Sequence, residues 1–226
     1  MKLALFDLDH TLLPIDSASA WSRFVVARAG LDTRVYGERI RAFAAAYRAG
    51  NFDVEAYLAF QLDLLARFPR ARLEQWRARF VADQIAPHVR PPALALIARH
   101  RAEGYELALV TGTNAFVTAP IAALFGIDHL LAVQPEEVGG RFTGRYVGTH
   151  TYRQGKVQAV EAFLAARGTS LADCADSVFY SDSINDLPLL ERVRRPVATN
   201  ADEQLRAVAA ARRWPMLELF AAVPTP

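Results

Sequence analysis

The sequence predicts an α/β protein in which an all-helical segment interrupts a parallel sheet that carries helices on both faces. Three observations lead to this prediction. A short apolar run at 3–6 has the character of a strand and ends at Asp7. The block 18–85 has apolar residues at helical spacing and lacks strand alternation. From residue 93 onward, strand and helix patterns alternate, which favours parallel strands joined by helices.

Composition narrows the class of protein. The 226 residues are 52% hydrophobic and 22% charged, which is typical of a globular chain. The net charge is only +2, and the densest basic group, within 67–79, has helical spacing, so it indicates a solvated helix face and no nucleic-acid partner. The single cysteine, Cys174, excludes an internal disulfide. The N-terminal apolar run is too short for a signal peptide, and no apolar run is long enough to span a membrane, so we expect a cytoplasmic protein. The sequence does not indicate an oligomeric state.

The helical block begins after Pro14, where Asp16 and Ser17 resemble a helix N-cap. Glycines and a proline divide the block, and a cluster of prolines at 87–92 closes it. We therefore expect a small helical cap domain at 16–89, inserted into a core made of 1–15 and 90–226. Its helices are expected at 18–28, 35–48, 53–68 and 73–85.

The core elements follow in order. Helices are expected at 93–103, 115–125, 154–167, after Asp186 to about 193, and at 202–212. Strands are expected at 105–110, 130–133, 177–180 and 196–199, with a β-hairpin around 142–147 after two glycines. The last residues, 223–226, are expected to be frayed.

Polar clusters follow three of these strands, where open parallel sheets bind ligands. The clusters are Asp7 with Asp9 and Thr11, the run 111–114, and Asp182 with Asp186; Lys156 stands near the start of a helix. If the first strand continues, alternation places Asp7 and Asp9 on one face, while His10 faces away. Alone, each cluster has an ordinary explanation: an acidic turn, a turn with a helix cap at Asn114, an acidic helix start, and a surface lysine. Together, in this order, they favour one site.

The combination resembles the motifs of the haloacid dehalogenase-like hydrolase superfamily. The first motif stands at 5–11, the second at 107–112, the third at Lys156 and the fourth at 180–190. The resemblance spans roughly residues 1–212. A helical insert between the first two motifs resembles the cap of the phosphoserine phosphatase-like branch, and the chain is most similar to bacterial hydrolases assigned as phosphoserine or histidinol-phosphate phosphatases.

This resemblance implies a Rossmann-like core and a phosphatase mechanism. Asp7 would be the nucleophile that forms an aspartyl-phosphate, Asp9 the general acid and base, and Lys156 the cation that neutralises charge. The implied cofactor is Mg²⁺. Its expected ligands are the Asp7 carboxylate, the Asp9 carbonyl and Asp182, with Asp186 either a ligand or next to one. The phosphoryl oxygens would be held by Thr111, Gly112, Thr113 and Asn114.

Asp16 stands where phosphoserine phosphatases usually carry a glutamate that contacts the substrate's amino group. It could have that role or act only as a helix cap. The cap aromatics, among them Trp21, Phe43 and Phe60, are expected to be mostly core, with one or two lining a pocket. The expected activity is Mg²⁺-dependent hydrolysis of a small phosphorylated metabolite, such as phosphoserine or histidinol phosphate. The alternatives are a phosphotransferase or mutase with the same intermediate, and a catalytically silent binding protein.

Overall fold

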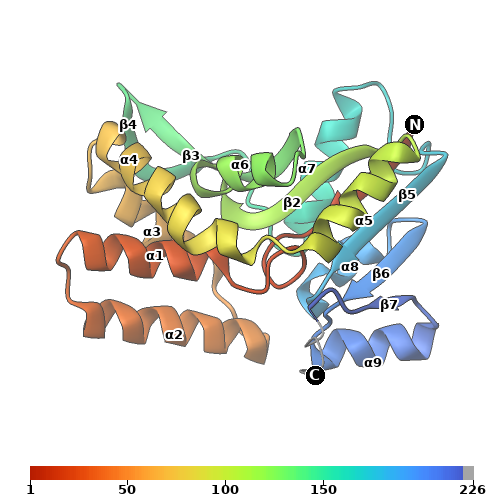
Figure 1. Cartoon of the computed structure of the whole chain (residues 1–226), viewed down its shortest axis with the longest axis horizontal. Coiled ribbons are helices and arrows are strands. Elements are labelled where there is room, and N and C mark those ends of the chain that lie inside the picture. Colours follow the sequence, from red (N-terminus) through yellow and green to blue (C-terminus); the bar gives the residue numbers. More distant parts are fainter. Residues whose placement is uncertain (221–226) are drawn as a thin grey trace.

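The computed structural model describes residues 1–220, and its centre is a seven-stranded sheet in the order β4-β3-β2-β1-β5-β6-β7 (Figure 1). All neighbouring strands are parallel except β3 and β4, which form an antiparallel hairpin. The predicted α/β class is therefore confirmed; the predicted frayed tail, 223–226, lies outside the described residues. The strands are β1 Lys2–Phe6, β2 Glu106–Asn114, β3 His129–Val138, β4 Arg141–Val147, β5 Asp176–Ser181, β6 Arg195–Thr199 and β7 Met216–Leu217.

The first strand, β1, lies at the centre of the sheet. Its last residue, Phe6, is level with Leu109 of β2 on one side and with Tyr180 of β5 on the other. The chain runs outward from β1 through β2 to β3 and β4, then returns to build β5, β6 and β7 on the opposite side. This reversal of strand order beside β1 opens a crevice at the carboxyl ends of β1, β2 and β5.

Alternation along β1 divides the core into two apolar layers. Ala4 and Phe6 pack with helices α5 and α6, while Leu3 and Leu5 pack with α7, α8 and α9 on the other face. The predicted covering of both faces by helices is confirmed (Figure 1). These helices are α5 Pro91–Ala102, α6 Ala115–Leu124, α7 Gln154–Ala165, α8 Leu187–Leu190 and α9 Glu203–Arg212.

The helical segment between β1 and α5 has the predicted four helices. Aspartates cap the first three: Asp16, Asp32 and Asp53 each accept a hydrogen bond from a backbone N–H of the first turn. The second ends at Gly50 in the left-handed conformation, at φ 77°. The helices are α1 Ser17–Arg28, α2 Thr33–Ala49, α3 Val54–Ala66 and α4 Arg70–Phe80, followed by a π-helical turn at Val81–Ile85 and a 3₁₀ turn at Ala86–His88.

The apolar core of this segment continues into that of the sheet. Trp21 of α1 packs edge-on against Phe80 of α4 and against Phe116 of α6, with ring centroids 5.3 and 6.0 Å apart. One cluster of buried residues therefore contains both parts. The division into a cap at 16–89 and a core stays a prediction.

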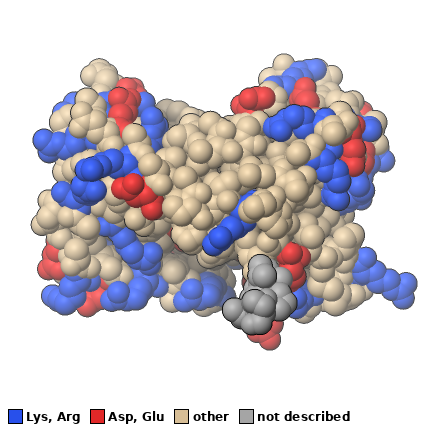
Figure 2. Space-filling view, in the orientation of Figure 1, with Lys and Arg blue, Asp and Glu red and all other residues tan. Residues whose placement is uncertain are grey.

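The basic group at 67–79 is only partly the expected solvated helix face, because Arg70 and Arg77 are half-buried and Arg77 donates to the Phe116 carbonyl at 2.7 Å. Arg67 pairs with Asp63 at 2.8 Å, and Arg70 contacts both Glu74 and Glu137. On the face drawn in Figure 2, basic side chains are interspersed with acidic ones at both ends, and the surface between them is mostly uncharged. Among the described helices, none combines the length and the apolar character needed to cross a membrane.

Several boundaries differ from the predicted ones. Strand β2 does not end at Val110: it continues to Asn114, with a register shift against β3 after Thr111, because β3 is long enough to pair with it. The helix after Asp186 stops at Leu190, since Arg194 bonds to Ser177 and turns the chain into β6. The two-residue strand β7 is too short for alternation to reveal it.

Candidate active site

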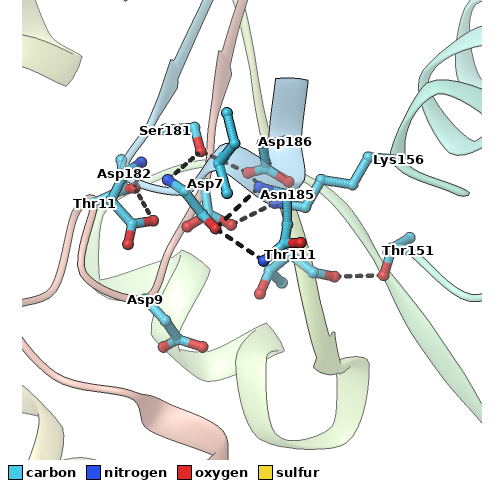
Figure 3. Close-up of polar contacts among 12 residues, drawn as sticks. Asp7, Asp9, Thr11, Thr111, Thr151, Lys156, Ser181, Asp182, Asn185 and Asp186 are labelled. Carbon is cyan, nitrogen blue, oxygen red and sulfur yellow. Dashed lines mark hydrogen bonds and ion pairs between the residues drawn. The ribbon is translucent and has the colours of Figure 1, made fainter. Parts of the chain in front are cut away.

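The first polar cluster lies in a tight turn directly after β1. Asp7 donates its backbone N–H to the Tyr180 carbonyl at 2.9 Å, and three backbone N–H groups then converge on the Leu8 carbonyl. His10 has a positive φ of 60°. Since the strand ends at Phe6, alternation does not extend to Asp9, and the carboxylates of Asp7 and Asp9 lie apart (Figure 3) and have different partners. The turn, not the strand, sets their positions.

Lys156 joins two of the predicted carboxylates. Its Nζ donates to Asp7 Oδ1 at 2.6 Å and to Asp186 Oδ2 at 2.7 Å, and all three residues are buried. Burial alone would lower the pKa of Lys156, but the charges of Asp186 and Asp7 outweigh it, so the pKa is raised. Lys156 is therefore a fixed positive charge. Ser181 Oγ donates to the same Asp186 oxygen at 2.6 Å (Figure 3).

The local sequence explains how Lys156 reaches this place. Lys156 lies in the first turn of α7, and the chain before it packs so closely that a side chain on Gly155 would overlap the His150 carbonyl. Thr151 fixes the same loop to the sheet, because its hydroxyl donates to the Thr111 carbonyl at 2.5 Å. The glycine before the lysine is thus a packing requirement of the site.

Asp182 supplies a third carboxylate, which is half-buried. Its backbone N–H donates to Thr11 Oγ1 at 3.0 Å, and Thr11 Oγ1 lies 3.2 Å from Asp182 Oδ1, where it can donate. Burial raises the pKa of Asp182, and repulsion from Asp7 and Asp186 adds to the increase.

This donor set fits a hard divalent cation. Asp7 and Asp186 pair with the one ammonium group of Lys156, and Asp182 adds a third carboxylate that repels both, so a bound cation would relieve this repulsion and favour the charged forms. Within residues 1–220, no three acidic, histidine or cysteine side chains are placed so that they could hold a metal ion by themselves. The expected set needs only two carboxylates and the Asp9 carbonyl, and Mg²⁺ ordinarily keeps several of its waters.

Asp9 links the turn to the start of the helical segment. Its Oδ1 accepts from the backbone N–H of Ser17, the first residue of α1, at 2.8 Å, and its Oδ2 accepts from Thr113 Oγ1 at 3.0 Å. Burial raises the pKa of Asp9 to about 7, and repulsion from Asp16 adds to the effect. A carboxyl group that titrates near neutrality can both give and take a proton.

The residues 111–114 at the end of β2 are divided between two roles. Thr111, Gly112 and Thr113 line the cavity above Asp7. Asn114, predicted to hold a phosphoryl oxygen, lies outside that lining: it caps α6 by accepting from Val117 N–H at 3.2 Å. The cap alternative considered for Asn114 is therefore the one that the structure favours, because its amide oxygen is already used by the helix.

A cavity of about 790 Å³ lies between these core loops and the helical segment. Asp16 lines it, although both of its carboxylate oxygens accept from Ser19, at 2.8 and 2.9 Å. The capping role is thus present, and the substrate role stays open. His10 also lines the cavity, contrary to its expected direction, because the turn replaces the strand. The cap side of the wall consists mainly of Arg23, Phe43, Tyr47, Arg48, Phe52, Tyr57 and His88.

The aromatic content of this wall exceeds the expectation of one or two side chains. Phe43, Tyr47, Phe52 and Tyr57 line the cavity, whereas Trp21 and Phe60 are buried in the core. Several polar residues that hold the site together were not among the predicted site residues. Ser181 and Asn185 stand inside the fourth motif, which was a usable signal, but nothing local marked Thr151 or Tyr152. Their contacts depend on segments far away in the sequence.

Comparison with known proteins places these features in context. A family model described as haloacid dehalogenase-like hydrolase matches residues 4–191. A histidinol-phosphatase of Neisseria meningitidis is 38% identical over 217 residues, which cover 96% of this chain and 98% of that protein. A phosphoserine phosphatase of Mycobacterium tuberculosis is 31% identical, with 93% of this chain and 68% of that protein covered.

Solved structures show the same architecture. The crystal structure of a Bordetella pertussis protein, described as of unknown function, has a TM-score of 0.92 and 45% identity, with 97% of this chain and 99% of that chain covered. A substrate-bound phosphoserine phosphatase complex has a TM-score of 0.69 at 20% identity, covering 96% and 92% of the two chains. The second likeness supports the fold alone.

Proposed function

We propose a reaction from the premise that this chain belongs to the haloacid dehalogenase-like hydrolase family and is a phosphatase. Asp7 would attack the phosphorus atom of a small phosphate monoester and form an aspartyl-phosphate. Lys156 holds Oδ1 of Asp7, so we assign Oδ2 as the attacking oxygen. The bond to the leaving alkoxide breaks as the new bond forms, and the alcohol departs.

Asp9 would serve both halves of the reaction. In the first half it donates its proton to the leaving oxygen, which a pKa of about 7 allows at neutral pH. In the second half it takes a proton from the water that attacks the aspartyl-phosphate, so that phosphate leaves and Asp7 is restored. Its two hydrogen bonds, from Ser17 and Thr113, would keep the carboxyl group oriented through both steps.

The phosphoryl group would be held by this chain's own donors and by Mg²⁺. Thr111, Gly112 and Thr113 line the cavity beside Asp7, and Lys156 lies beneath the nucleophile. Asp7, Asp182 and the Asp9 carbonyl are the proposed ligands, with Asp186 holding Lys156. When bound, Mg²⁺ would offset the carboxylate charges and polarise the phosphoryl oxygens.

The buried Lys156–Asp7 pair beneath an open cavity is the observation that carries this proposal. The test is phosphate release from p-nitrophenyl phosphate with Mg²⁺, with excess chelator, and with Ca²⁺ in place of Mg²⁺. We expect activity only with Mg²⁺, because the larger Ca²⁺ tolerates looser coordination and disturbs in-line attack. Full activity in chelator would refute the metal assignment. Transfer of phosphate to an added alcohol in preference to water would favour the phosphotransferase alternative.

For the substrate, we propose an amine that also carries a ring. Asp16 offers a carboxylate to an amino group, and the aromatic wall offers faces to a planar or cationic ring. The cavity volume of about 790 Å³ falls within the roughly 300–1,000 Å³ typical of small-molecule sites. These features favour histidinol phosphate over phosphoserine, in line with the name of the Neisseria relative.

A direct comparison of the two substrates tests this choice. Burying a ring against aromatic side chains contributes about 1.5–3 kcal/mol, so we expect kcat/KM to be roughly 10- to 150-fold higher for histidinol phosphate. A preference for phosphoserine would refute the proposal that the substrate carries a ring, but it would leave the proposed phosphatase mechanism intact.

A further inference from the structure

The turn between α2 and α3 touches the core at the mouth of the cavity. Tyr47, in the last turn of α2, donates its hydroxyl to Ser183 Oγ at 3.0 Å, across 136 residues of sequence. The rings of Tyr47 and Phe52 lie 5.9 and 5.3 Å from that of Tyr152, which belongs to the core loop before α7. This turn is therefore held to two different core loops.

The second core loop contains a strained arginine. Arg153 has φ 50° and ψ −118°, a conformation that residues with a side chain rarely adopt. Its guanidinium donates through Nε and one terminal nitrogen to Asn185 Oδ1, at 3.0 and 2.9 Å, and reaches the carbonyl of Gly50 at the end of α2 at 3.4 Å. Such strain persists only where the surroundings hold it, and it concentrates at functional positions.

Both contacts end on the loop that carries two of the proposed active-site acids. Ser183 and Asn185 lie between Asp182 and Asp186 and bond to each other, through the Asn185 backbone N–H to Ser183 Oγ at 3.2 Å. Ser183 N–H in turn donates to Ser181 Oγ at 3.2 Å, and Ser181 Oγ donates to Asp186. A continuous set of hydrogen bonds thus joins the cap to the carboxylate that holds Lys156.

We propose that Tyr47 and Arg153 are positioning residues that form a latch between the cap and the loop 182–186. The latch consists of Tyr47, Tyr152, Arg153, Ser183 and Asn185. It keeps the α2–α3 turn over the cavity and fixes the loop in the arrangement that the chemistry needs. The importance of the latch for turnover rests on the proposed function, whereas its effect on the loop does not.

Two substitutions test the latch from its two sides. Arg153→Gly removes the guanidinium and also relieves the backbone strain, so a purely structural role predicts little change or a higher Tm with unchanged activity. The latch predicts a fall in kcat of roughly 10- to 100-fold, because small misplacements of catalytic groups cost that much. KM for p-nitrophenyl phosphate should change little. Tyr47→Phe removes only the hydroxyl oxygen. Like Arg153→Gly, it should lower kcat, and it should do so without unfolding the protein.

Each variant has a matched control. Arg213 also has a positive φ, 56°, at the end of α9, so Arg213→Gly makes the same chemical change at a position with no part in the latch. Tyr36 lies on α2 and packs on Phe60 inside the cap, which makes Tyr36→Phe the control for Tyr47→Phe. We expect both controls to keep wild-type kcat. The double variant of Tyr47 and Arg153 should lose less than the product of the single losses; independent, fully additive losses would overturn a single latch.

Hydrogen exchange of the substrate-free protein provides a readout without catalysis. Amides in 181–187 and in the turn 47–52 should exchange faster in Arg153→Gly and in Tyr47→Phe than in the wild type and the controls. Unchanged exchange in both segments would overturn the latch whatever the activity. If the wild type released no phosphate while exchange responded as expected, the proposed function would fail and the latch would stand.

Discussion

The two walls of the cavity are built on different principles. On the core wall, Asp7 and Lys156 are buried and Asp9 is half-buried. Each is held by short polar contacts, such as the two bonds of Lys156 and the two of Asp9. The cap wall carries four aromatic side chains beside polar and basic ones, and its rings pack edge-on or tilted, with centroids about 5.0–6.4 Å apart. Chemistry requires particular atoms at fixed places, whereas recognition by apolar shape can be achieved with many side chains. We therefore expect the core wall to carry out catalysis and the cap wall to select the substrate.

The largest effect should come from removing the nucleophile on the core wall. Asp7→Asn keeps the side-chain volume but removes the attacking oxygen, so we expect kcat to fall by roughly 10⁴-fold or more on every substrate. Lys156 keeps Asp186 as a partner, so the fold should survive. Turnover is measured together with circular dichroism, which reports whether the variant is folded. A folded variant with near wild-type turnover would refute the proposed mechanism.

The next effect should depend on the leaving group. Asp9→Asn removes the proton donor, which is worth about 10²–10⁴-fold for an alkyl phosphate that leaves as a poor alkoxide. For p-nitrophenyl phosphate the leaving phenolate needs less help, so the first step should suffer less. The check is a comparison of burst and steady-state rates on both esters. Identical first-step losses on the two would mean that Asp9 does not protonate the leaving group.

A smaller and selective effect is expected on the cap wall. If Asp16 binds an amino group, Asp16→Ala should cost about 1.5–3 kcal/mol, or roughly 10- to 150-fold in kcat/KM, for the amino-bearing substrate only. p-Nitrophenyl phosphate has no amine and should be little affected. Asp16→Asn is the matched control for capping, since it can still accept from Ser19 N–H without the charge. Equal effects on both substrates, or none, would leave Asp16 as a helix cap alone.

The smallest effect concerns stability at a site remote from both walls. His100 of α5 is buried against Tyr180, with Nε2 2.7 Å from the hydroxyl, and burial lowers its pKa to about 4, with repulsion from Arg99 adding to the shift. The unfolded chain binds the proton near pH 6.5, so stability is intact above that pH and falls as the pH drops toward 4. The loss should be on the order of 2–3 kcal/mol.

His100→Gln removes this titration and provides the control. The difference in free energy of unfolding between wild type and variant, measured by denaturant titration at several pH values, should change between pH 6.5 and 4 and be constant above. A difference that is independent of pH would show that His100 does not titrate differently in the folded and unfolded states.

Local sequence determined much of this protein. Apolar spacing predicted the order and nature of the main helices and strands, since buried faces follow the periods of the two structures. The polar residues that close the strands predicted the gathering of Asp7, Lys156, Asp182 and Asp186. Parallel strands bring their carboxyl ends together, so polar motifs that follow neighbouring strands are predicted to lie close to one another.

Only the tertiary structure decided how the remaining groups are used. Asp9 turns away from Asp7 because the strand stops at Phe6, and Asn114 caps a helix because its amide lies beside Val117. The aromatic wall and the contact of Tyr47 with Ser183 arise where the helical segment between β1 and α5 packs on the loops at the strand ends. The contact between Tyr47 and Ser183 follows no motif and leaves no periodic or local signal, because it depends on how finished elements pack and not on how each element forms.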